Sequence, residues 1–408
     1  MNILVVNCGS SSVKYQLFDM DRNMVLAKGL VSRIGMSGAV LTHKPHDRQE
    51  VKVSGEILDH IIAIQYVISI LLSENHGVIK DKSEIHAVGH RVVHGGEKFA
   101  ESVLIERDVI REIRQLIELA PLHNPHNIRG IDACRKQLPD IPQVAVFDTA
   151  FHQKMPPMAY IYGIPYVLYK KYGIRRYGFH GPSHLYVTAR AAEIEGKSIK
   201  DFKMISCHLG NGASITAVDR GISVDTSMGF TPLEGLLMGT RSGDMDPAVI
   251  LHIMGREELS LHEANTLLNK HSGLSGISGI SSDMREIEEA LGDGHSNAKL
   301  AFEIYCYRLR KYIGAYAAAM NGLDKIIFTA GVGENSSLVR KTTCDGLGFL
   351  GVEIDEEKNR QAVGKEMTIS SAESRVQVQV IPTNEEFVIA RDTLRLVQKQ
   401  SNTEPVST

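Results

Sequence analysis

A chain of 408 residues is too long to fold around one ordinary hydrophobic core, so we expect two domains. Its 43% apolar and 23% charged residues exclude a disordered protein, and a net charge of −3 argues against a nucleic-acid partner. Five cysteines without a CxxC pair predict neither a disulfide framework nor a zinc site, and they favour a reducing, cytoplasmic setting.

The first predicted hairpin contains an unusual turn. An apolar strand, residues 3–6, is interrupted by Asn7, Cys8, Gly9 and three serines before an alternating strand resumes at Val13. Most hairpin loops need only roughly two to five residues of ordinary turn chemistry. The surplus of glycine and hydroxyl groups predicts that hydrogen-bond donors gather there around an anion.

The most apolar stretch, "IIAIQYVISILL" at residues 61–72, is about half the length of the roughly 20 residues that a membrane span requires. It predicts a buried helix. No basic region precedes the first apolar run, so the sequence predicts no signal peptide and no membrane partner.

The pattern of the first hairpin, an apolar strand followed by a Gly/Asn/Ser turn and a second strand, is repeated in residues 204–218, "MISCHLGNGASITAV". A third glycine turn, "KIIFTAGVGEN" at residues 325–335, follows a long predicted helix. Each turn alone is typical of a plain tight turn. Together they predict two phosphate hairpins and a nucleoside loop in a duplicated fold, with a boundary near residue 150 and a ligand cleft between the copies.

Two arginines stand at the ends of apolar segments, Arg91 in "VGHRVVHGGEKF" and Arg241 in "LLMGTRSGDMDP". A guanidinium in such a place needs an anionic partner because it does not lose its charge. One such arginine favours a structural ion pair. Two, in a chain with two phosphate hairpins, favour a clamp on carboxylate or phosphate oxygens.

Histidines lie beside several of these loops. His180 and His184 in "HGPSH" have metal-ligand spacing, but the intervening Gly-Pro is unfavourable in a helix and no H-E-x-x-H pattern is present, so a zinc site is not predicted. His180 is a candidate donor to a phosphoryl group, and His184 is expected to be structural. His123 and His208 fit a structural or a ligand role equally.

Two acids complete the candidate set, Asp148 in "FDTAFH" and Glu385 in "TNEE". Each could serve a phosphate-bound cation, but Asp148 could equally pair with an arginine and Glu385 could stabilise a helix dipole. The last helix is predicted to begin with a capping box of Thr383 and Glu386. Residues 401–408 are expected to form a disordered tail.

These motifs together resemble the acetate kinase family over nearly the whole chain. The resemblance implies an α/β fold of two duplicated ribonuclease H-like, actin-like ATPase domains with βββαβαβα cores and a cleft between them. It places the N-terminal domain at 1–150 plus 385–400 and the nucleotide-binding domain at 151–384. The matching motifs are "NCGSSSVKY", "GHRVVHGGEKF", "APLHNP", "FDTAFH", "YGFHGPSH", "HLGNGASI", "DTSMGFTPLEGLLMGTRSGDMDP", "TAGVGEN" and "IPTNEE".

The resemblance also implies an enzyme, usually a homodimer, that reversibly transfers the γ-phosphoryl group of ATP directly to acetate, giving acetyl phosphate and ADP. Mg²⁺ is the implied cofactor, with Mn²⁺ as a substitute. Acetate is already ionised at neutral pH, which agrees with the absence of an obvious general base. The implied catalytic residues are Arg91, Asp148, His180 and Arg241, and the implied metal-site residues are Asn7 and Glu385.

Two further residue sets follow from the resemblance. One forms a pocket for the acetate methyl group and is apolar throughout, as that group requires: Val93, Leu122, Phe179 and Pro232, together with Arg91 on the carboxylate. The other binds nucleotide: Lys14, His208, Leu209, Gly210, Asn211, Gly212, Asp283, Met284, Arg285, Gly331, Val332, Gly333, Glu334 and Asn335.

The chain departs from the family pattern at two positions, where Cys8 replaces a commoner alanine and Pro182 a commoner threonine. Cys8 would add a thiol beside the phosphates, with a sensitivity to alkylation as one expectation. Pro182 would remove a backbone donor near His180. Neither change touches an expected catalytic side chain.

Two alternatives stay open. One is a propionate or butyrate kinase of the same fold, whose substrate is longer than acetate by one or two methylene groups. Each methylene changes the discrimination between substrates by only roughly 1 to 3 kcal/mol. Val93, in place of a smaller residue, favours acetate. A nucleotide-switch ATPase of the same superfamily would share the hairpins but has no need of two arginines and a methyl-sized pocket.

Overall fold

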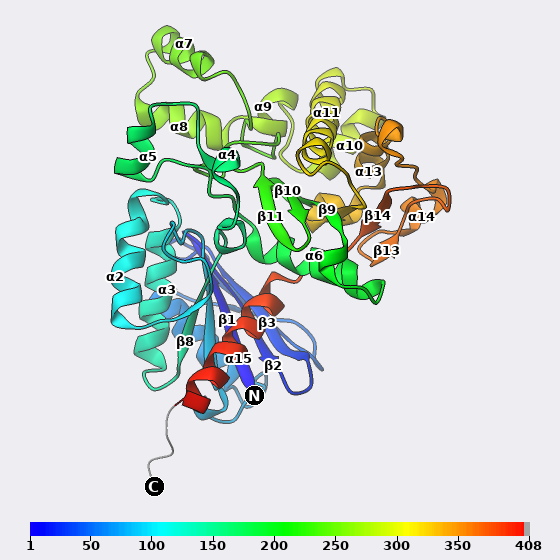
Figure 1. Ribbon diagram of the computed structural model, residues 1–408. Coiled ribbons are helices and arrows are strands. Elements are labelled where there is room, and N and C mark those ends of the chain that lie inside the picture. Colours follow the sequence, from blue (N-terminus) through cyan, green and yellow to red (C-terminus); the bar gives the residue numbers. More distant parts are fainter. Residues whose placement is uncertain (404–408) are drawn as a thin grey trace. The chain divides into compact units, whose positions relative to one another are not determined.

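The computed structural model describes residues 1–403 and divides the chain into two compact units. Unit 1 comprises Met1–Ala150 together with the chain from Asn384 onward, and unit 2 comprises Phe151–Thr383. Each unit is built around its own mixed β-sheet (Figure 1).

The sheet of unit 1 has eight strands in the order β5-β4-β3-β2-β1-β6-β8-β7. The chain first forms an antiparallel meander from β1 to β5, and then adds β6 and β8 parallel to β1 on its other side. The strands are β1 Asn2–Cys8, β2 Ser12–Asp19, β3 Met24–Ser32, β4 Val40–Pro45, β5 Val51–Ser54, β6 Ala87–Val92, β7 Val103–Leu104 and β8 Gln143–Phe147.

Helices cover both faces of this sheet because β1 is apolar on both sides. Leu4 and Val6 belong to a core shared with α1 and α3, whereas Ile3 and Val5 belong to a core shared with α15. The apolar stretch at residues 61–72 is confirmed as a buried helix, α1. The helices of unit 1 are α1 His60–Leu71, α2 Arg107–Gln115, α3 Asn124–Gln137 and α15 Glu385–Thr403.

Unit 2 repeats the topology, which confirms the predicted duplication. Its sheet has the order β11-β10-β9-β12-β14-β13, with β9 antiparallel to β10 and parallel to β12, as β1 is to β2 and β6. The strands are β9 Lys203–Leu209, β10 Ala213–Asp219, β11 Ile222–Thr226, β12 Lys325–Thr329, β13 Met367–Thr368 and β14 Gln377–Val380.

The helices of unit 2 are more numerous. The helix α6 packs on β9 and β12, and α11 is long and contacts α9, α10 and α13 (Figure 1). None of the helices within residues 1–403 is long and apolar enough to span a bilayer. The helices are α4 Pro157–Tyr160, α5 Tyr166–Tyr172, α6 Gly181–Ile194, α7 Pro247–Glu257, α8 Leu261–Lys270, α9 Gly273–Ser278, α10 Met284–Gly292, α11 Ser296–Ala319, α12 Ala330–Asn335, α13 Ser337–Cys344 and α14 Glu356–Gln361.

The third glycine turn is not a turn. Residues 330–335 form the short helix α12 directly after β12, and Arg340 of α13 donates to the carbonyl oxygens of Gly333 (2.8 Å) and Glu334 (3.0 Å). Two glycines disfavour a helix in isolation, but these tertiary hydrogen bonds hold the last turn. Similarly, the Gly-Pro of "HGPSH" opens α6 rather than disrupting it, because proline is favoured in a first turn.

The start and the end of α15 also differ from expectation. The predicted capping box is wrong: the N–H of Phe387 donates to Asn384 (3.2 Å), Thr383 bonds to Ser183, and Glu386 pairs with a lysine. At the other end, residues 401–403 of the expected disordered tail continue the helix, since extending a helix costs less than starting one. Residues 404–408 of that tail lie outside the described residues.

The close approach of α15 to β6 depends on Gly89. A Cβ atom at this position would lie 2.5 Å from Oγ1 of Thr393 and 2.7 Å from Cγ2 of Ile389. We therefore expect Gly89→Ala to push α15 away and to destabilise unit 1 by about 1 to 3 kcal/mol. Urea unfolding measures this loss. Gly255→Ala in α7, where a Cβ has open space, is the control and should leave stability unchanged or raised, and an equal effect of both changes would contradict the packing argument.

Candidate functional site

In unit 1, a guanidinium and two carboxylates meet where parallel strands end. Arg91 is on β6 and Asp148 directly follows β8; because these strands are parallel neighbours, the two side chains share one sheet edge. Nε and Nη2 of Arg91 donate to the two carboxylate oxygens of Asp148 at 2.8 and 2.7 Å. Glu385, at the start of α15, lies 3.6 Å from Nη1 of Arg91. The guanidinium is thus oriented bidentately and its charge is balanced.

The protonation of this pair follows from burial and charge. Burial disfavours the cation, but Asp148 and Glu385 outweigh it and raise the pKa of Arg91 above its ordinary value. Burial raises the pKa of Asp148, which is only 2% exposed, and Arg91 opposes that rise. Arg91 therefore stays charged, with Asp148 fixing its direction.

Asn127 of α3 joins the glycine-serine hairpin to the expected methyl pocket. Its amide donates to the carbonyl of Cys8 (3.0 Å), and its oxygen accepts the N–H of Val93 (3.0 Å). Neighbouring Asn124 holds both backbone groups of His94 in the same way. The sequence analysis missed both asparagines, although they lie in "APLHNPHN", because it weighed only the histidine of that motif.

The remaining expected residues of unit 1 differ in exposure. Asn7 and Val93 are half-buried at strand ends, whereas Leu122 is 55% exposed. Lys14, on β2 opposite Asn7, forms an ion pair with Glu386 at 2.5 Å. A lysine assigned to nucleotide is therefore held by the acid next to Glu385.

The expectation that Cys8 is sensitive to alkylation has no support in the structure. The residue is 4% exposed, and burial raises the pKa of its thiol to about 12. Its sulfur lies against Gly130 of α3, where a Cβ would come within 2.3 Å. Since the thiolate is the reactive species, a protonated, buried thiol is inert and acts as a small apolar side chain.

In unit 2, a row of hydroxyls and imidazoles lies beneath His180. Nδ1 of His180 bonds to Oγ of Ser214 at 2.9 Å, and the same Oγ bonds to Nε2 of His184 at 2.8 Å. Nδ1 of His184 bonds to Oγ of Ser206 at 2.9 Å. The His180 ring also stacks on His208, with centroids 4.1 Å apart. His184 is thus structural, as expected, and Ser214 links it to His180.

This row can set the tautomer of His180. Burial, with neighbouring imidazoles, lowers the pKa of His184 well below its ordinary value, so that ring is neutral. If Ser206 donates to His184, then His184 donates to Ser214 and Ser214 donates to Nδ1 of His180. The proton of His180 then resides on Nε2.

Arg241 of unit 2 contrasts with Arg91. Its Nη1 donates to the carbonyl of Pro232 (3.2 Å) and contacts the sulfur of Met238 (3.8 Å), and no carboxylate contacts it within residues 1–403. Burial lowers the pKa of Arg241 without an acid to offset it, yet a guanidinium remains charged. Nη1 lies over Gly212, where a Cβ would come within 3.1 Å. An uncompensated cation therefore lies beside the second glycine hairpin.

The expected nucleotide residues of unit 2 mostly surround one cavity of about 710 Å³, within the range of small-molecule sites. Those that line it are Gly210, Asn211, Asp283, Met284, Arg285, Gly331, Val332 and Asn335; those that do not are His208, Leu209, Gly212, Gly333 and Glu334. Sequence analysis missed seven lining residues: Gly239, Leu274, Ser282, Glu288, Tyr305, Ser336 and Val363.

Two residues outside the cavity have other partners. His208 bonds through Nδ1 to Oγ of Ser183 (2.7 Å). Glu334 accepts a hydrogen bond from the N–H of Thr383 (3.1 Å), and its carboxylate approaches the hydroxyl of Thr329 (3.5 Å). The first of these bonds fixes α12 to the last residue of unit 2. Phe179, one of the four expected methyl-pocket residues, is 2% exposed, and its carbonyl accepts a hydrogen bond from Nε2 of His152 (3.0 Å).

Comparison with known proteins agrees with this geometry. The model of the acetokinase family matches residues 2–391. The chain belongs to the acetokinase family. It is 58% identical over 399 residues to an acetate kinase of Desulfitobacterium hafniense strain Y51, covering 98% of this chain and 100% of the relative. It is also 58% identical over 398 residues to an acetate kinase of Halothermothrix orenii, covering 98% and 100%.

Solved structures give the same result. A crystal structure of Porphyromonas gingivalis acetate kinase superposes with a TM-score of 0.94 at 49% identity, covering 97% of this chain and 99% of that one. A propionate kinase from Francisella tularensis gives 0.91 at 44% identity, covering 97% and 99%. The predicted family and fold are thereby confirmed, and the chain is a phosphotransferase that acts on a carboxyl group.

Ser214→Ala tests the tautomer argument. Without the hydroxyl, nothing in the row donates to Nδ1 of His180, so we expect kcat to fall by about ten- to a hundredfold, the range for groups that orient a functional imidazole. The acetate KM should change little, and the pH profile of kcat should shift. Steady-state kinetics from pH 6 to 8.5 give both readouts.

The matched control is Thr216→Ser, which keeps a hydroxyl on the same strand away from His180. An unchanged pH profile in Ser214→Ala, with a properly folded protein, would contradict the proposed proton arrangement.

Proposed function

We propose that the chain catalyses the reversible transfer of the ATP γ-phosphoryl group to acetate by direct in-line displacement. A carboxylate oxygen of acetate attacks the γ-phosphorus as the bond to the β–γ bridging oxygen breaks, which gives acetyl phosphate and ADP. The observation that carries the proposal is Arg241, a guanidinium without an acidic partner among residues 1–403, beside a glycine hairpin. A loose phosphoryl transition state needs such a charge and no general base.

The proposed roles follow from charge and hydrogen bonding. Arg91 and Arg241 hold the acetate carboxylate and the transferring phosphoryl group, and Asp148 keeps Arg91 in a fixed direction. His180 donates to an equatorial phosphoryl oxygen. Each arginine is assigned to an anionic group that takes part in the transfer, so loss of either should remove a contact made mainly in the transition state.

The acetate methyl group is assigned to Val93, Leu122, Phe179 and Pro232. All four are apolar, and a pocket of this kind separates acetate from propionate only modestly, because one methylene changes discrimination by roughly 1 to 3 kcal/mol. Because one of the similar structures is a propionate kinase, propionate is the alternative substrate. We propose acetate as the preferred acid, with propionate slower.

ATP and ADP are assigned to the cavity of unit 2, and the domain assignment follows. Residues 151–384 would be the nucleotide-binding domain and residues 1–150 with 385–400 the N-terminal domain. The division of the chain at Ala150 and Thr383 supports this.

Mg²⁺ is assigned to Asn7 and Glu385, with Mn²⁺ able to replace it because both prefer oxygen ligands. The donors fit a hard cation, an amide oxygen and one carboxylate. No group of three His, Cys, Asp or Glu residues suited to hold an ion occurs among the described residues. We assign the rest of the ion's coordination to phosphates and water, as is usual for Mg²⁺. When bound, Mg²⁺ would neutralise phosphate charge.

The chain is proposed to form a homodimer in the cytoplasm. Large apolar side chains are exposed on α4, α5, α7 and α8 of unit 2, which favours a covered face: Met158, Val167, Leu251 and Leu261. The five cysteines are all free and buried, as in a reducing compartment. Sedimentation equilibrium tests the dimer, and a mass of one chain at micromolar concentration would contradict it.

The function is tested by an acyl phosphate assay. The purified protein is incubated with ATP, Mg²⁺ and acetate, propionate or butyrate, and the product is trapped as the hydroxamate. We expect acetate to react fastest. Arg91→Ala and Arg241→Ala should each lower kcat by at least about a hundredfold, the cost of removing a transition-state donor.

Arg360→Ala, which removes a surface arginine paired with Glu356 and Glu357, is the matched control and should keep full activity. Acyl phosphate from none of the acids despite ATP binding would overturn the proposal in favour of a nucleotide-switch ATPase. Normal activity in either site variant would remove that arginine from the site.

A further inference from the structure

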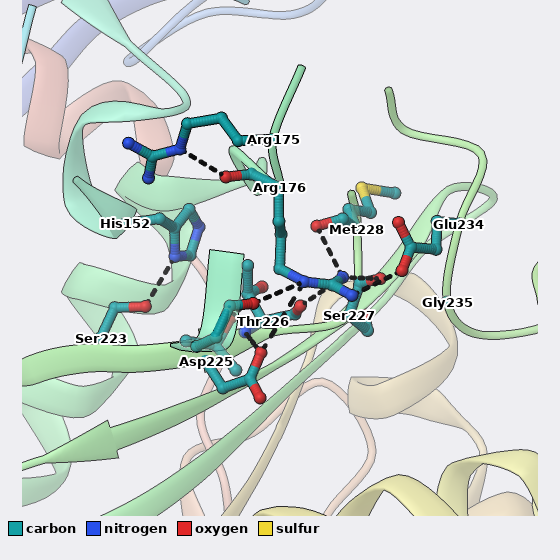
Figure 2. Close-up of polar contacts among 12 residues, drawn as sticks. His152, Arg175, Arg176, Ser223, Asp225, Thr226, Ser227, Met228, Glu234 and Gly235 are labelled. Atoms are coloured by element: carbon teal, nitrogen blue, oxygen red, sulfur yellow. Dashed lines mark hydrogen bonds and ion pairs between the residues drawn. The ribbon is translucent and has the colours of Figure 1, made fainter. Parts of the chain in front are cut away.

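Arg176, between α5 and α6, has no role in the site assigned above, yet its guanidinium is the centre of a dense polar cluster. Its Nη1 donates to the carbonyl oxygens of Thr226 (2.9 Å) and Ser227 (3.0 Å), and more weakly to that of Met228 (3.4 Å). The side chain is 16% exposed, and Figure 2 shows it reaching into the turn that follows β11. Arg176 thus pairs the carbonyl oxygens at the end of β11 and in the irregular backbone that follows it.

The same guanidinium holds the one acid of that segment. Nη2 of Arg176 lies 2.5 Å from Oε1 of Glu234 (Figure 2), and the Tyr162 hydroxyl donates to Oε2 of the same carboxylate. The Tyr162 oxygen also accepts the N–H of Phe230 at 2.8 Å. The Glu234 carboxylate also lies close against the backbone of Gly229, where a Cβ atom would come within 1.7 Å of Oε2. We call Arg176, Glu234 and Tyr162 the Arg176 cluster.

The cluster holds both ends of the loop at residues 226–234. Residues 226–228 are held by Arg176, and Phe230 and Glu234 by Tyr162 and Arg176. Pro232 lies between the last two, and its carbonyl accepts from Nη1 of Arg241 at 3.2 Å. The cluster therefore fixes the backbone that carries one proposed methyl-pocket residue and supports one proposed phosphoryl ligand.

Charge separates the roles of the two arginines. Burial disfavours the cation of Arg176, but Glu234 outweighs it and raises the pKa of Arg176, with Asp225 adding to the rise from 3.9 Å. Arg176 therefore stays protonated, and its positive charge is balanced by Glu234 and Asp225 rather than left for a substrate. Arg241 has no acidic partner within residues 1–403. Glu234 is the acid nearest to Pro232 in the sequence, and its two oxygens are both occupied by the cluster.

We propose that the Arg176 cluster positions Pro232 and Arg241, and thereby sets the affinity and chain-length selectivity for the acyl substrate without affecting nucleotide. The inference rests on the proposed assignment of these two residues to the acyl site. No member of the cluster is among the residues that line the nucleotide cavity in the described part of the chain. The cluster members are positioning residues, because they act through the loop.

The test uses two variants that loosen the loop by independent routes. Arg176→Lys keeps the charge but loses the fork that bonds the carbonyls and Glu234 together. Tyr162→Phe keeps the ring but removes the hydroxyl that joins Glu234 to Phe230. For each variant we expect the acetate KM to rise at least about tenfold, because small misplacements of a binding group are costly. The ratio of kcat/KM for propionate to that for acetate should rise, since a less fixed Pro232 admits a longer chain.

The ATP KM should stay within about twofold, which separates loss of acyl positioning from a general loss of structure. Arg190→Lys is the matched control: this arginine of unit 2 pairs with Glu366 and Glu193 at the surface, and its replacement should change no kinetic constant. If Arg176→Lys does not fold, Tyr162→Phe alone decides. Unchanged acetate KM and selectivity in the folded variants, or equal rises in both KM values, would overturn the proposal.

Pro232→Ala, measured in parallel, separates this inference from the site assignment on which it rests. If Pro232→Ala alters acyl selectivity and the cluster variants do not, only the inference fails. If Pro232→Ala has no effect on the acetate KM or on selectivity, the assignment of Pro232 to the acyl pocket fails as well.

Discussion

The chemistry proposed for this protein depends on how the charges of two half-buried guanidinium groups are balanced. A guanidinium cannot shed its charge, so its surroundings must supply an anion or leave it ready for one. Arg91 has Asp148 on two of its nitrogens and Glu385 nearby, whereas Arg241 has only a carbonyl and a sulfur. The guanidinium of Arg91 is held in a fixed direction, and that of Arg241 is left without a counter-charge among the described residues. The proposed phosphoryl transfer depends on this difference more than on the number of arginines.

The duplicated sheets explain why such groups occur at strand ends. In each unit an antiparallel hairpin precedes two parallel strands, so glycine-rich turns and the residues after parallel strands share one edge of the sheet. Arg91 and Asp148 use that edge in unit 1, and the second hairpin with α12 uses it in unit 2. Side chains from α3 and α13 bond to backbone carbonyls at this edge: Asn127 bonds to that of Cys8 at the end of β1, and Arg340 to that of Gly333 in α12. Rigid strands thus hold irregular backbone where ligands are expected.

Local patterns predicted much of this. The period-two runs on either side of Gly9 and the apolar residues 61–72 predicted strands and a helix that the structure contains, because those elements bury a continuous apolar face. The pattern failed where tertiary contacts decide. Residues 330–335 form a helix held by Arg340, and Thr383 bonds to Ser183 instead of capping α15.

The residues that the sequence did not reveal are those that act at long range. Ser214 of β10 bonds to His180 and His184, which lie 34 and 30 residues earlier in the chain, and Arg176 bonds to the carbonyl of Thr226, which lies 50 residues later. No local spacing encodes such partners. The burial of Cys8 likewise involves Gly130 of a helix far away in the sequence, so local pattern did not reveal that this thiol is buried and that burial raises its pKa.

The most direct test of the charge argument compares the thermal stability of Arg91→Met and Arg241→Met with and without acetyl phosphate. We predict that Arg91→Met lowers stability strongly, by about 3 kcal/mol or more, because it leaves Asp148 buried and unpaired. Arg241→Met should leave the ligand-free protein as stable as the unaltered chain or more so, while abolishing the stabilisation by ligand. Equal destabilisation by both changes, or full ligand stabilisation in Arg241→Met, would contradict the account.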